Sequence, residues 1–229
     1  MKFSIIIPTL NEAQAIMSCL SALQKFRNDA ELIIIDGGST DNTVALAKPW
    51  VDKLLTSSAG RAQQMNLGAE QANGEILLFL HADTFLPESG LELIAQQLDH
   101  YYQWGRFNIQ LQGKHYMLKI IAFMMNWRSK LTGIATGDQA IFVSKTAFET
   151  VGGYPDIRLM EDIALSKVLK TLGPPYCVKQ HVLSSGRRWL QNGVYKTILL
   201  MWSLRFRYYL GADANILAQC YAQGLFWKH

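Results

Sequence analysis

Apolar residues fall in short unbroken runs along the first half of the chain, and each run ends on polar or charged residues. The clearest run, residues 76–80, is Ile-Leu-Leu-Phe-Leu, and it is followed by His81 and Asp83. A run of this length favours a strand over a helix, and unbroken apolarity is typical of a strand covered on both faces. A similar run at residues 32–36 ends on a carboxylate, Asp36. The pattern predicts a sheet buried between helices.

Segments with helical periodicity separate these strands. The predicted strands cover residues 3–7, 32–36, 51–55, 76–80, 138–143 and 176–183, and a predicted edge strand with alternating apolar positions covers residues 105–112. The predicted helices cover residues 12–26, a short stretch after Asp41, 60–72, 87–98, 117–131, 145–151, 160–172, 190–210 and 214–225. This order predicts an α/β fold, with a Rossmann-like, mostly parallel sheet flanked by helices and a helical C-terminal tail.

Composition and cysteine usage limit the class of protein. Of the 229 residues, 49% are hydrophobic and 17% are charged, which is typical of a globular chain with a sizeable core. A net charge of +4 is too small to indicate a nucleic-acid partner. The three cysteines are far apart and lack metal-ligand spacing, so we expect reduced thiols in a cytoplasmic protein. We expect neither a signal peptide nor a membrane span.

Positive charge gathers toward the C-terminus, where Asp213 is the one acid from residue 187 onward. The basic residues there are Arg187, Arg188, Lys196, Arg205, Arg207 and Lys228. Residues 117–131 and 189–210 are apolar and aromatic with basic margins, which is typical of an interfacial helix. One interpretation is peripheral contact with the inner face of an anionic membrane. The other is that both segments are core helices or the subunit interface of a homo-oligomer.

Three candidate residues stand at the strand ends. A carboxylate such as Asp36 can accept hydrogen bonds from a ribose or a base, or it can satisfy its own turn. Asp83 fits a divalent-cation site, because Mg²⁺ and Mn²⁺ are held by one or two carboxylates plus substrate phosphates. Its alternative role is to cap the following helix. The role of His81 stays open: it could be a metal ligand, a hydrogen-bond donor to a ligand or a core residue.

The second half of the chain adds two further groups. Glu161 and Asp162 open a predicted helix, where the macrodipole favours acids, and one of them could instead be the general base for an acceptor hydroxyl. The sequence Arg187-Arg188-Trp189 follows a glycine and suits phosphate binding and stacking, or a solvated basic turn. Arg61, at the start of a helix, is a further phosphate candidate.

Taken in order, these pieces resemble the motifs of one enzyme family. Residues 5–12, 35–41, 60–68 and 79–83 look like the nucleotide half of a family 2 glycosyltransferase with the GT-A fold. Gly137-Asp138-Gln139, Met160-Glu161-Asp162 and Arg187-Arg188-Trp189 resemble its acceptor half. The likeness covers residues 3 to about 190. Within the family it points to a bacterial branch of small, single-domain members with a His-Ala-Asp form of the Asp-x-Asp motif.

The resemblance implies a role for each matched position. The nucleotide-binding positions would be Pro8, Thr9, Glu12, Asp36, Arg61 and His81. The positions that contact the acceptor or the diphosphate would be Asp138, Arg187, Arg188 and Trp189. Asp83 would hold Mg²⁺ or Mn²⁺, which neutralises charge on the departing nucleoside diphosphate. Asp162, beside Glu161, would be the catalytic base of an inverting displacement.

One position departs from the family pattern. His81 stands where the first aspartate of Asp-x-Asp is expected, which removes a carboxylate near the ribose or the metal. His181, on the last predicted strand, is a candidate for a further metal ligand, because related enzymes sometimes draw one from the C-terminal half. Its alternative is a core histidine.

The resemblance implies one transferase domain over residues 1–229. Its nucleotide half would cover about 1–100, its acceptor half about 101–190, and its C-terminal helices 190–229. The donor would be a nucleoside-diphosphate sugar, and the acceptor is either lipid-linked or a small molecule. Two other functions stay open. A non-catalytic nucleotide- or glycan-binding module is favoured only by His81. A nucleotidyltransferase would carry a glycine-rich loop with a basic residue after the first strand, where this chain has Pro-Thr-Leu-Asn-Glu.

Overall fold

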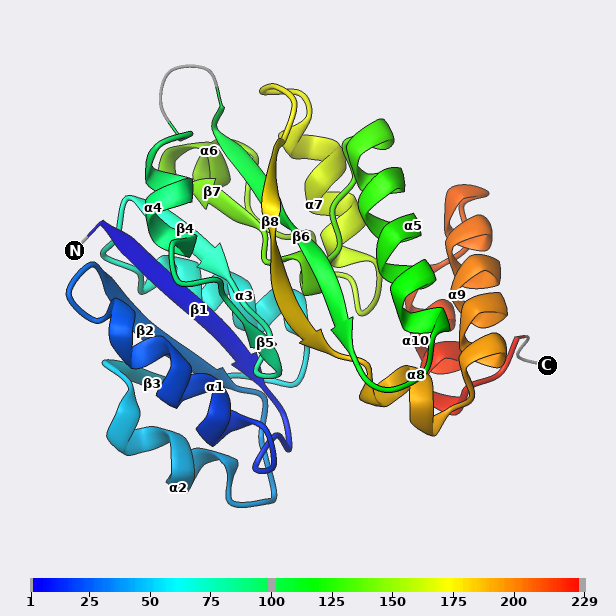
Figure 1. The fold of residues 1–229 in the computed structure, drawn as a ribbon, viewed down its shortest axis with the longest axis horizontal. Helices are drawn as coiled ribbons and strands as arrows, with labels where there is room; N and C mark the ends of the chain where they lie inside the picture. Colours follow the sequence, from blue (N-terminus) through cyan, green and yellow to red (C-terminus); the bar gives the residue numbers. More distant parts are fainter. Residues whose placement is uncertain (1, 99–101, 227–229) are drawn as a thin grey trace.

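One sheet organises the part of the chain described by the computed structural model, residues 2–98 and 102–226. Within these residues eight strands lie in the order β3-β2-β1-β4-β7-β6-β8-β5 (Figure 1). They are β1 (Phe3–Thr9), β2 (Ala30–Asp36), β3 (Lys53–Thr56), β4 (Ile76–Phe79), β5 (Thr84–Phe85), β6 (Trp104–Gln112), β7 (Phe142–Ser144) and β8 (Tyr176–Ser185). The helices around the sheet are α1 (Ile16–Leu23), α2 (Thr43–Ala47), α3 (Arg61–Glu70), α4 (Gly90–Ala95), α5 (Met117–Thr132), α6 (Lys145–Thr150), α7 (Glu161–Leu169), α8 (Arg187–Gln191), α9 (Val194–Tyr209) and α10 (Ala214–Gln223).

The two halves of the sheet differ in strand direction. Strands β3, β2, β1 and β4 run parallel to one another. Strand β7 pairs antiparallel with β4 and β6, whereas β8 pairs parallel with β6 and antiparallel with β5. The predicted parallel order is therefore confirmed for the first half, and the second half adds antiparallel strands. In the parallel half, the carboxyl ends of β1, β2 and β4 meet at one edge, where ligands bind in open α/β sheets.

The apolar runs are buried on both faces of the sheet, as their lack of alternation predicts. In β1, Ile5 and Ile7 pack into one hydrophobic cluster with α1, and Ile6 packs into a second cluster with α3. Burial of one isoleucine contributes about 1.5–3 kcal/mol, so a polar residue at any of these positions would be strongly destabilising. A third cluster joins α7, α9 and α10. The C-terminal helices are thus packed against the sheet domain.

Two details of the predicted strands are wrong. Residues 105–112 were expected at an edge, but β6 lies between β7 and β8. Its alternation arises because α5 packs on one face while the other face is exposed toward the end of the strand. Residues 137–139 form a 3-10 turn instead of the start of a strand, because Thr136 and Gln139 close a capping box, and β7 begins only at Phe142.

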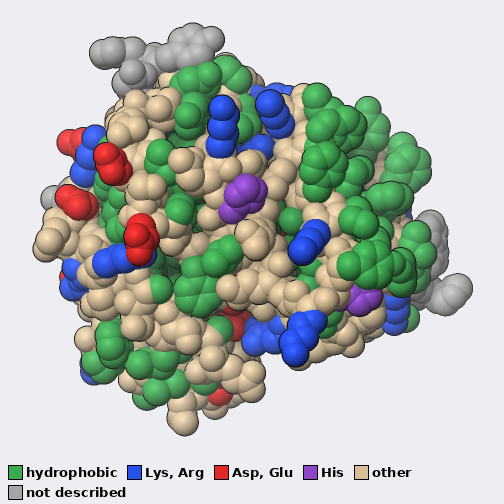
Figure 2. All heavy atoms as spheres, in the orientation of Figure 1, with side chains coloured by type: hydrophobic (Ala, Val, Ile, Leu, Met, Phe, Trp, Pro, Cys, Tyr) green, Lys and Arg blue, Asp and Glu red, His purple; other side chains and the backbone are tan. Residues whose placement is uncertain are grey.

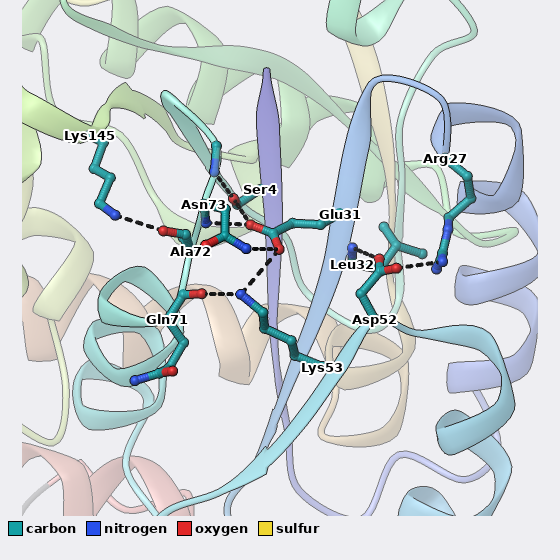
Figure 3. Close-up of polar contacts among 11 residues, drawn as sticks. Ser4, Arg27, Glu31, Leu32, Asp52, Lys53, Gln71, Ala72, Asn73 and Lys145 are labelled. Atoms are coloured by element: carbon teal, nitrogen blue, oxygen red, sulfur yellow. Dashed lines mark hydrogen bonds and ion pairs between the residues drawn. The ribbon is translucent and has the colours of Figure 1, made fainter. Parts of the chain in front are cut away.

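Polar residues at the opposite edge, where the strands begin, satisfy one another (Figure 3). The buried Glu31 carboxylate accepts hydrogen bonds from Ser4 Oγ and Asn73 N, both at 2.5 Å, and pairs with Lys53 Nζ at 3.3 Å. Burial works to raise the pKa of Glu31, but these contacts outweigh it and lower the pKa. A surface hollow of about 740 Å³ also lies at this edge, remote from the carboxyl ends of the strands. We therefore assign this edge a structural role.

The structure also shows the state of the three cysteines and the lengths of the helices. Cys19, Cys177 and Cys220 are free thiols, and the first and last of them are buried. Burial, followed by the charge of Asp83, raises the pKa of Cys19 to about 12, which leaves its thiol unreactive. Within the described residues, no helix is both long enough and apolar enough to cross a membrane.

Candidate active site

The loops after β1 and β2 are tied to each other by hydrogen bonds. Asn11 Oδ1 accepts a hydrogen bond from Thr40 N at 2.9 Å, and Asn11 N donates to Ser39 Oγ at 2.8 Å. Glu12 N donates to Thr43 Oγ1 at 2.8 Å. Because these bonds link residues far apart in the sequence, the two loops form one unit at the end of the parallel strands. Pro8 and Thr9, two of the predicted nucleotide-binding residues, are the last residues of β1 beneath it.

Asp36 is buried and its carboxylate is saturated by its surroundings. Its oxygens accept hydrogen bonds from Ser39 Oγ at 2.5 Å, Ser39 N at 2.7 Å, Gly38 N at 2.9 Å and Thr9 Oγ1 at 3.2 Å. Behind this turn, the buried Gln64 donates to the carbonyl oxygens of Thr9 and Ile35. The structure therefore gives Asp36 the turn-forming role, and contact with a nucleotide stays a prediction.

Asp83 differs from Asp36 because no side chain among the described residues hydrogen-bonds to it. Burial, followed by the negative charge of Glu12, raises the pKa of the Asp83 carboxyl, with Asp138 acting in the same direction and Arg187 against it. Arg187 Nη2 lies 3.2 Å from Glu12 Oε2. The fold thus gathers three acids and one guanidinium, from four separate segments, at the end of β4.

His81 packs against Gly137 and is held neutral. A Cβ atom at position 137 would lie 2.7 Å from His81 Nε2, so only glycine fits there without movement of the ring. Burial, followed by the charge of Arg61, lowers the pKa of His81 to about 3, although Asp162 opposes the shift. Its imidazole is therefore uncharged at neutral pH. The departure from Asp-x-Asp replaces a carboxylate by a neutral ring that contacts the acceptor half.

Asp162 lies at the same edge as Asp83. Its Oδ2 accepts a hydrogen bond from Gly137 N at 2.9 Å, and its Oδ1 accepts one from Ile163 N at 2.7 Å. Because Gly137 also packs on His81, Asp162 is joined through it to the residues that end β4. The helix begins sharply here, since its cap residue Met160 has a φ of 69° in the left-handed region. This geometry brings the predicted base and the predicted metal ligand together.

Glu161 is the buried partner of Asp162, with 6% of its surface exposed. Burial, followed by the charge of Asp162, raises the pKa of Glu161 to about 7, and Arg61 opposes the shift. Close to neutral pH, Glu161 is therefore partly protonated. Asp162 is the less buried of the two, and its role as the base stays a prediction.

Arg61 lies among the acids of the acceptor half, and Asp138 is one of the charges that act on it. Negative charges on Glu161, Asp162 and Asp138 raise the pKa of Arg61 against the opposing effect of burial around its guanidinium. Among residues 2–98 and 102–226, no group hydrogen-bonds to the Asp138 carboxylate. Arg61 is exposed and Asp138 is half-buried. Contact of either side chain with a substrate stays a prediction.

The Arg187-Arg188-Trp189 sequence is divided between three surroundings. Arg187 pairs with Glu12, while the Arg188 guanidinium lies 3.5 Å from the centre of the Tyr221 ring and donates to Tyr221 O at 3.2 Å. Trp189 is partly buried against the main hydrophobic cluster. Only Arg187 reaches the groups around Asp83 directly, so joint closure of all three over a diphosphate stays a prediction.

His181 lies away from Asp83. Strand β8 pairs antiparallel with β5, with Ser184 opposite Thr84, so moving along β8 from Ser184 to His181 leads away from Asp83 by roughly 10 Å. His181 is also solvent-exposed, which contradicts its interpretation as a core histidine. The structure does not bring it into the site.

Some residues of the site have no signal in the sequence motifs. They are Gln64 behind the Asp36 turn, Tyr221 under Arg188, and Arg128 and Arg205, which act on each other near Asp162. A polar residue between apolar positions of a helix, as at Gln64, is the kind of signal that could have found one of them. Lys228, a member of the basic tail, lies outside the described residues.

The residues around Asp83 fit a divalent cation that is completed by substrate phosphates. Within the described residues there is no cluster of three or more His, Cys, Asp or Glu side chains able to hold a metal alone. Asp83 nevertheless offers an uncommitted carboxylate, and the nearby charges of Glu12 and Asp138 make its surroundings favourable to a cation. One or two carboxylates plus phosphate oxygens are the usual ligands of Mg²⁺ and Mn²⁺ in such sites.

Known proteins match both the sequence and the fold. The family profile described as "Glycosyl transferase family 2" matches residues 4–149. A PGL/p-HBAD biosynthesis glycosyltransferase of Mycobacterium tuberculosis is 40% identical over 95 residues, which are 38% of this chain and 37% of that protein. The poly(ribitol-phosphate) beta-N-acetylglucosaminyltransferase TarS of Staphylococcus aureus is 30% identical over 112 residues, 44% of this chain and 20% of TarS. The matches thus span between a fifth and two fifths of these relatives.

Among solved structures, the mannosyltransferase PcManGT from Pyrobaculum calidifontis, in complex with GDP-Man and Mn²⁺, has a TM-score of 0.67 to this chain at 19% identity. The superposition covers 97% of this chain and 64% of that one. An identity this low speaks for the fold alone. The fold is GT-A, as the motifs predicted.

Proposed function

The chain belongs to glycosyl transferase family 2, and from that premise we propose that it transfers a sugar from a nucleoside-diphosphate sugar to an acceptor hydroxyl. The observation that carries the proposal is the position of Asp162 beside His81, at the edge where β4 delivers Asp83. A displacement of this kind needs the leaving diphosphate and the attacking hydroxyl to be held on one side of the protein.

On the donor side, we propose that the joined loops after β1 and β2 hold the nucleoside. The residues assigned to it are Pro8, Thr9, Glu12, Asp36, Arg61 and His81. Arg61 and Arg187 supply positive charge for phosphate oxygens. Asp83 would hold Mg²⁺ or Mn²⁺, and such an ion neutralises charge on the leaving nucleoside diphosphate when bound.

On the acceptor side, we propose Asp162 as the general base. Each of its oxygens accepts one backbone hydrogen bond, which fixes the carboxylate and leaves lone pairs free for a hydroxyl proton. Asp162 takes that proton while the hydroxyl oxygen bonds to the anomeric carbon. The bond from this carbon to the diphosphate breaks on the opposite face, so the configuration inverts. Asp138 is assigned to the acceptor.

The domain boundaries follow the same division. We propose one domain over residues 1–229, with a nucleotide half to about residue 100, an acceptor half to about residue 190 and packed C-terminal helices after it. The contact of Tyr221 on α10 with Arg188 supports placing these helices in the same domain.

We also propose that α5 and α9 rest on an anionic membrane surface at its inner face. Hydrophobic side chains gather on the surface over α5 and α9 (Figure 2). They are not core, because Phe123, Trp127, Trp202 and Phe206 are all more than half exposed. The two helices carry lysines and arginines and no acid, which suits anionic lipid and disfavours a second copy of the same face. We expect the protein to float with anionic vesicles at low salt. If it stays in the bottom fraction under these conditions, the proposed membrane contact is wrong.

Calorimetric titration with a panel of nucleoside diphosphates, with and without Mn²⁺, tests the donor assignment. We expect a uridine or guanosine diphosphate to bind, and to bind more tightly when Mn²⁺ is present. If neither binds under either condition, the proposed donor class is wrong. The titration needs no knowledge of the acceptor.

A further inference from the structure

Two arginines near Asp162 keep buried nitrogens that nothing in the described part of the chain satisfies. Arg128 on α5 keeps Nε and Nη2 buried without a hydrogen bond, and Arg205 on α9 keeps Nε buried in the same way, over residues 2–98 and 102–226. Neither guanidinium joins an ion pair within those residues. A buried donor without an acceptor costs about 1–3 kcal/mol, and more when it is charged. An acceptor from outside the chain would remove this cost.

Positive charge accumulates at this point. Burial, followed by the charge of Arg205, lowers the pKa of Arg128 to about 10, and Arg106 acts in the same direction while Asp162 and Asp138 oppose it. Arg128 thus stays protonated at neutral pH. Arg106 is itself buried and has an Nε without a partner among the described residues. Arg106, Arg128 and Arg205 therefore repel one another, and within the described residues none of them forms an ion pair with a nearby acid. An anion placed between them would be strongly favoured.

The two arginines stand on helices that lie side by side (Figure 1). Tyr116 Oη, next to the start of α5, lies 2.8 Å from Tyr195 Oη at the start of α9. Arg128 and Arg205 act on each other near the opposite ends of the same helices. Both arginines are therefore held by two packed helices rather than by loops.

From this geometry we infer that Arg128 and Arg205 form a subsite for a phosphate group carried by the acceptor. The inference rests on the transferase function proposed above. Guanidinium groups bind phosphate oxygens through paired, charge-assisted hydrogen bonds. The donor diphosphate is served by other groups, since Arg187 is the cation that acts on Asp83, whereas Arg128 acts near Asp162. A phosphate held here would direct a neighbouring hydroxyl toward the proposed base.

The binding test uses inorganic phosphate as its probe, with UDP and Mn²⁺ present to fill the donor side. We expect the wild-type protein to bind phosphate and the R128Q/R205Q double variant to bind it at least tenfold more weakly. The matched control is K130Q, which removes an exposed positive charge from the same helix and should bind like the wild type. Equal phosphate binding by the double variant and the wild type would overturn the inference.

Two further readouts distinguish a phosphate subsite from a pair of arginines that only supports the fold. The ligand-free double variant should be at least as stable as the wild type, because it removes buried, unpaired charges. A large loss of thermal stability would mean that the arginines hold the fold together and would overturn the subsite. UDP affinity should be equal in all variants. If UDP fails to bind even the wild type, the donor assignment fails, while phosphate binding still tests the arginines.

The source of the phosphate is decided by two probes. One is a phosphatidylcholine vesicle that contains an isoprenyl phosphate, and the other is a soluble hexose phosphate. Trp127 and Phe206, which adjoin the two arginines in sequence, are 53% and 64% exposed, so a lipid tail has an apolar surface beside the subsite. Arginine-dependent binding of either probe supports the inference and names the source. Failure of both probes to show any dependence on the arginines overturns it.

Discussion

We call the part of the proposed site around Asp36 its nucleoside end, and the part around Asp83, Asp138 and Asp162 its transfer end. These two ends satisfy their polar groups in opposite ways. At the nucleoside end, Asp36 accepts four hydrogen bonds from its own turn and the neighbouring strand. At the transfer end, Asp83 and Asp138 have no side-chain partner within the described residues, and Arg128 has unpaired buried nitrogens. The first end is built before any ligand arrives. The second holds charges that a cation, a diphosphate and an acceptor would complete.

This difference predicts that substitutions at the two ends impair different properties of the protein. Loss of a saturated group should lower the stability of the protein. Loss of an uncommitted charge should not lower stability, and it should alter ligand binding or turnover. Substitutions of five acids in and around the site test this division.

Asp162→Asn should give the largest loss of turnover. We expect hydrolysis of a bound nucleotide sugar, measured as nucleoside diphosphate released, to fall by about 10² to 10⁴, because the amide cannot take a proton. The affinity for the nucleoside diphosphate should be unchanged by calorimetry. Full turnover in this variant would place the base elsewhere and would end the functional distinction between the two ends.

Glu161→Gln should change the pH dependence of stability. The pKa of Glu161 is raised in the folded protein from 4.5 to about 7, so its ionisation opposes folding. The stability conferred by the protonated form is complete below about pH 4.5 and is lost as the pH rises through about 7. The glutamine variant should therefore gain on the order of 2–3 kcal/mol over the wild type at pH 8 and little at pH 4.5. A pH-independent difference in denaturant unfolding would contradict this account.

Asp36→Asn should lower the free energy of unfolding by about 2 kcal/mol, because hydrogen bonds to a charged acceptor contribute about 1.5–3 kcal/mol each and the amide replaces one acceptor by a donor. The matched comparison is Asp138→Asn, an acid of the same site without a hydrogen-bond partner among the described residues, which should stay within about 0.5 kcal/mol of the wild type. Equal losses in both variants would remove the contrast between the two ends.

Asp83→Asn should weaken nucleotide binding only when a metal is present. We expect the Kd for the nucleoside diphosphate in Mn²⁺ to rise about tenfold, which corresponds to about 1.4 kcal/mol. Without Mn²⁺, the same titration should show no loss, because the side chain has no other assigned contact with the ligand. A loss of equal size in both conditions would mean that Asp83 acts by shaping the site.

The sequence alone predicts the carboxyl ends of the parallel strands well, because their contacts are local or lie in neighbouring parallel strands. The apolar runs of β1, β2 and β4 and the acids that follow them are enough to place Asp36 and Asp83 at one edge. Even there, the saturation of Asp36 is invisible, because it depends on the conformation of the turn at Gly38 and Ser39.

The transfer end is harder to predict because its groups come from distant segments whose placement depends on packing. The edge position expected for β6 is wrong because β8 pairs on its far side, which no pattern within residues 105–112 reveals. In the sequence, Arg128 and Arg205 are indistinguishable from the other basic residues at the margins of apolar helices. Only the packing of α5 beside α9 brings Arg128 within reach of the charges of Arg205 and Asp162.

A crystal structure with Mn²⁺ and a non-hydrolysable nucleotide sugar tests the central claim most directly. We expect the nucleoside to lie on the loops after β1 and β2, the diphosphate and the ion to lie at Asp83, and the anomeric carbon of the sugar to face Asp162. A nucleotide bound at the edge where the strands begin, or a sugar separated from Asp162 by the sheet, would contradict it.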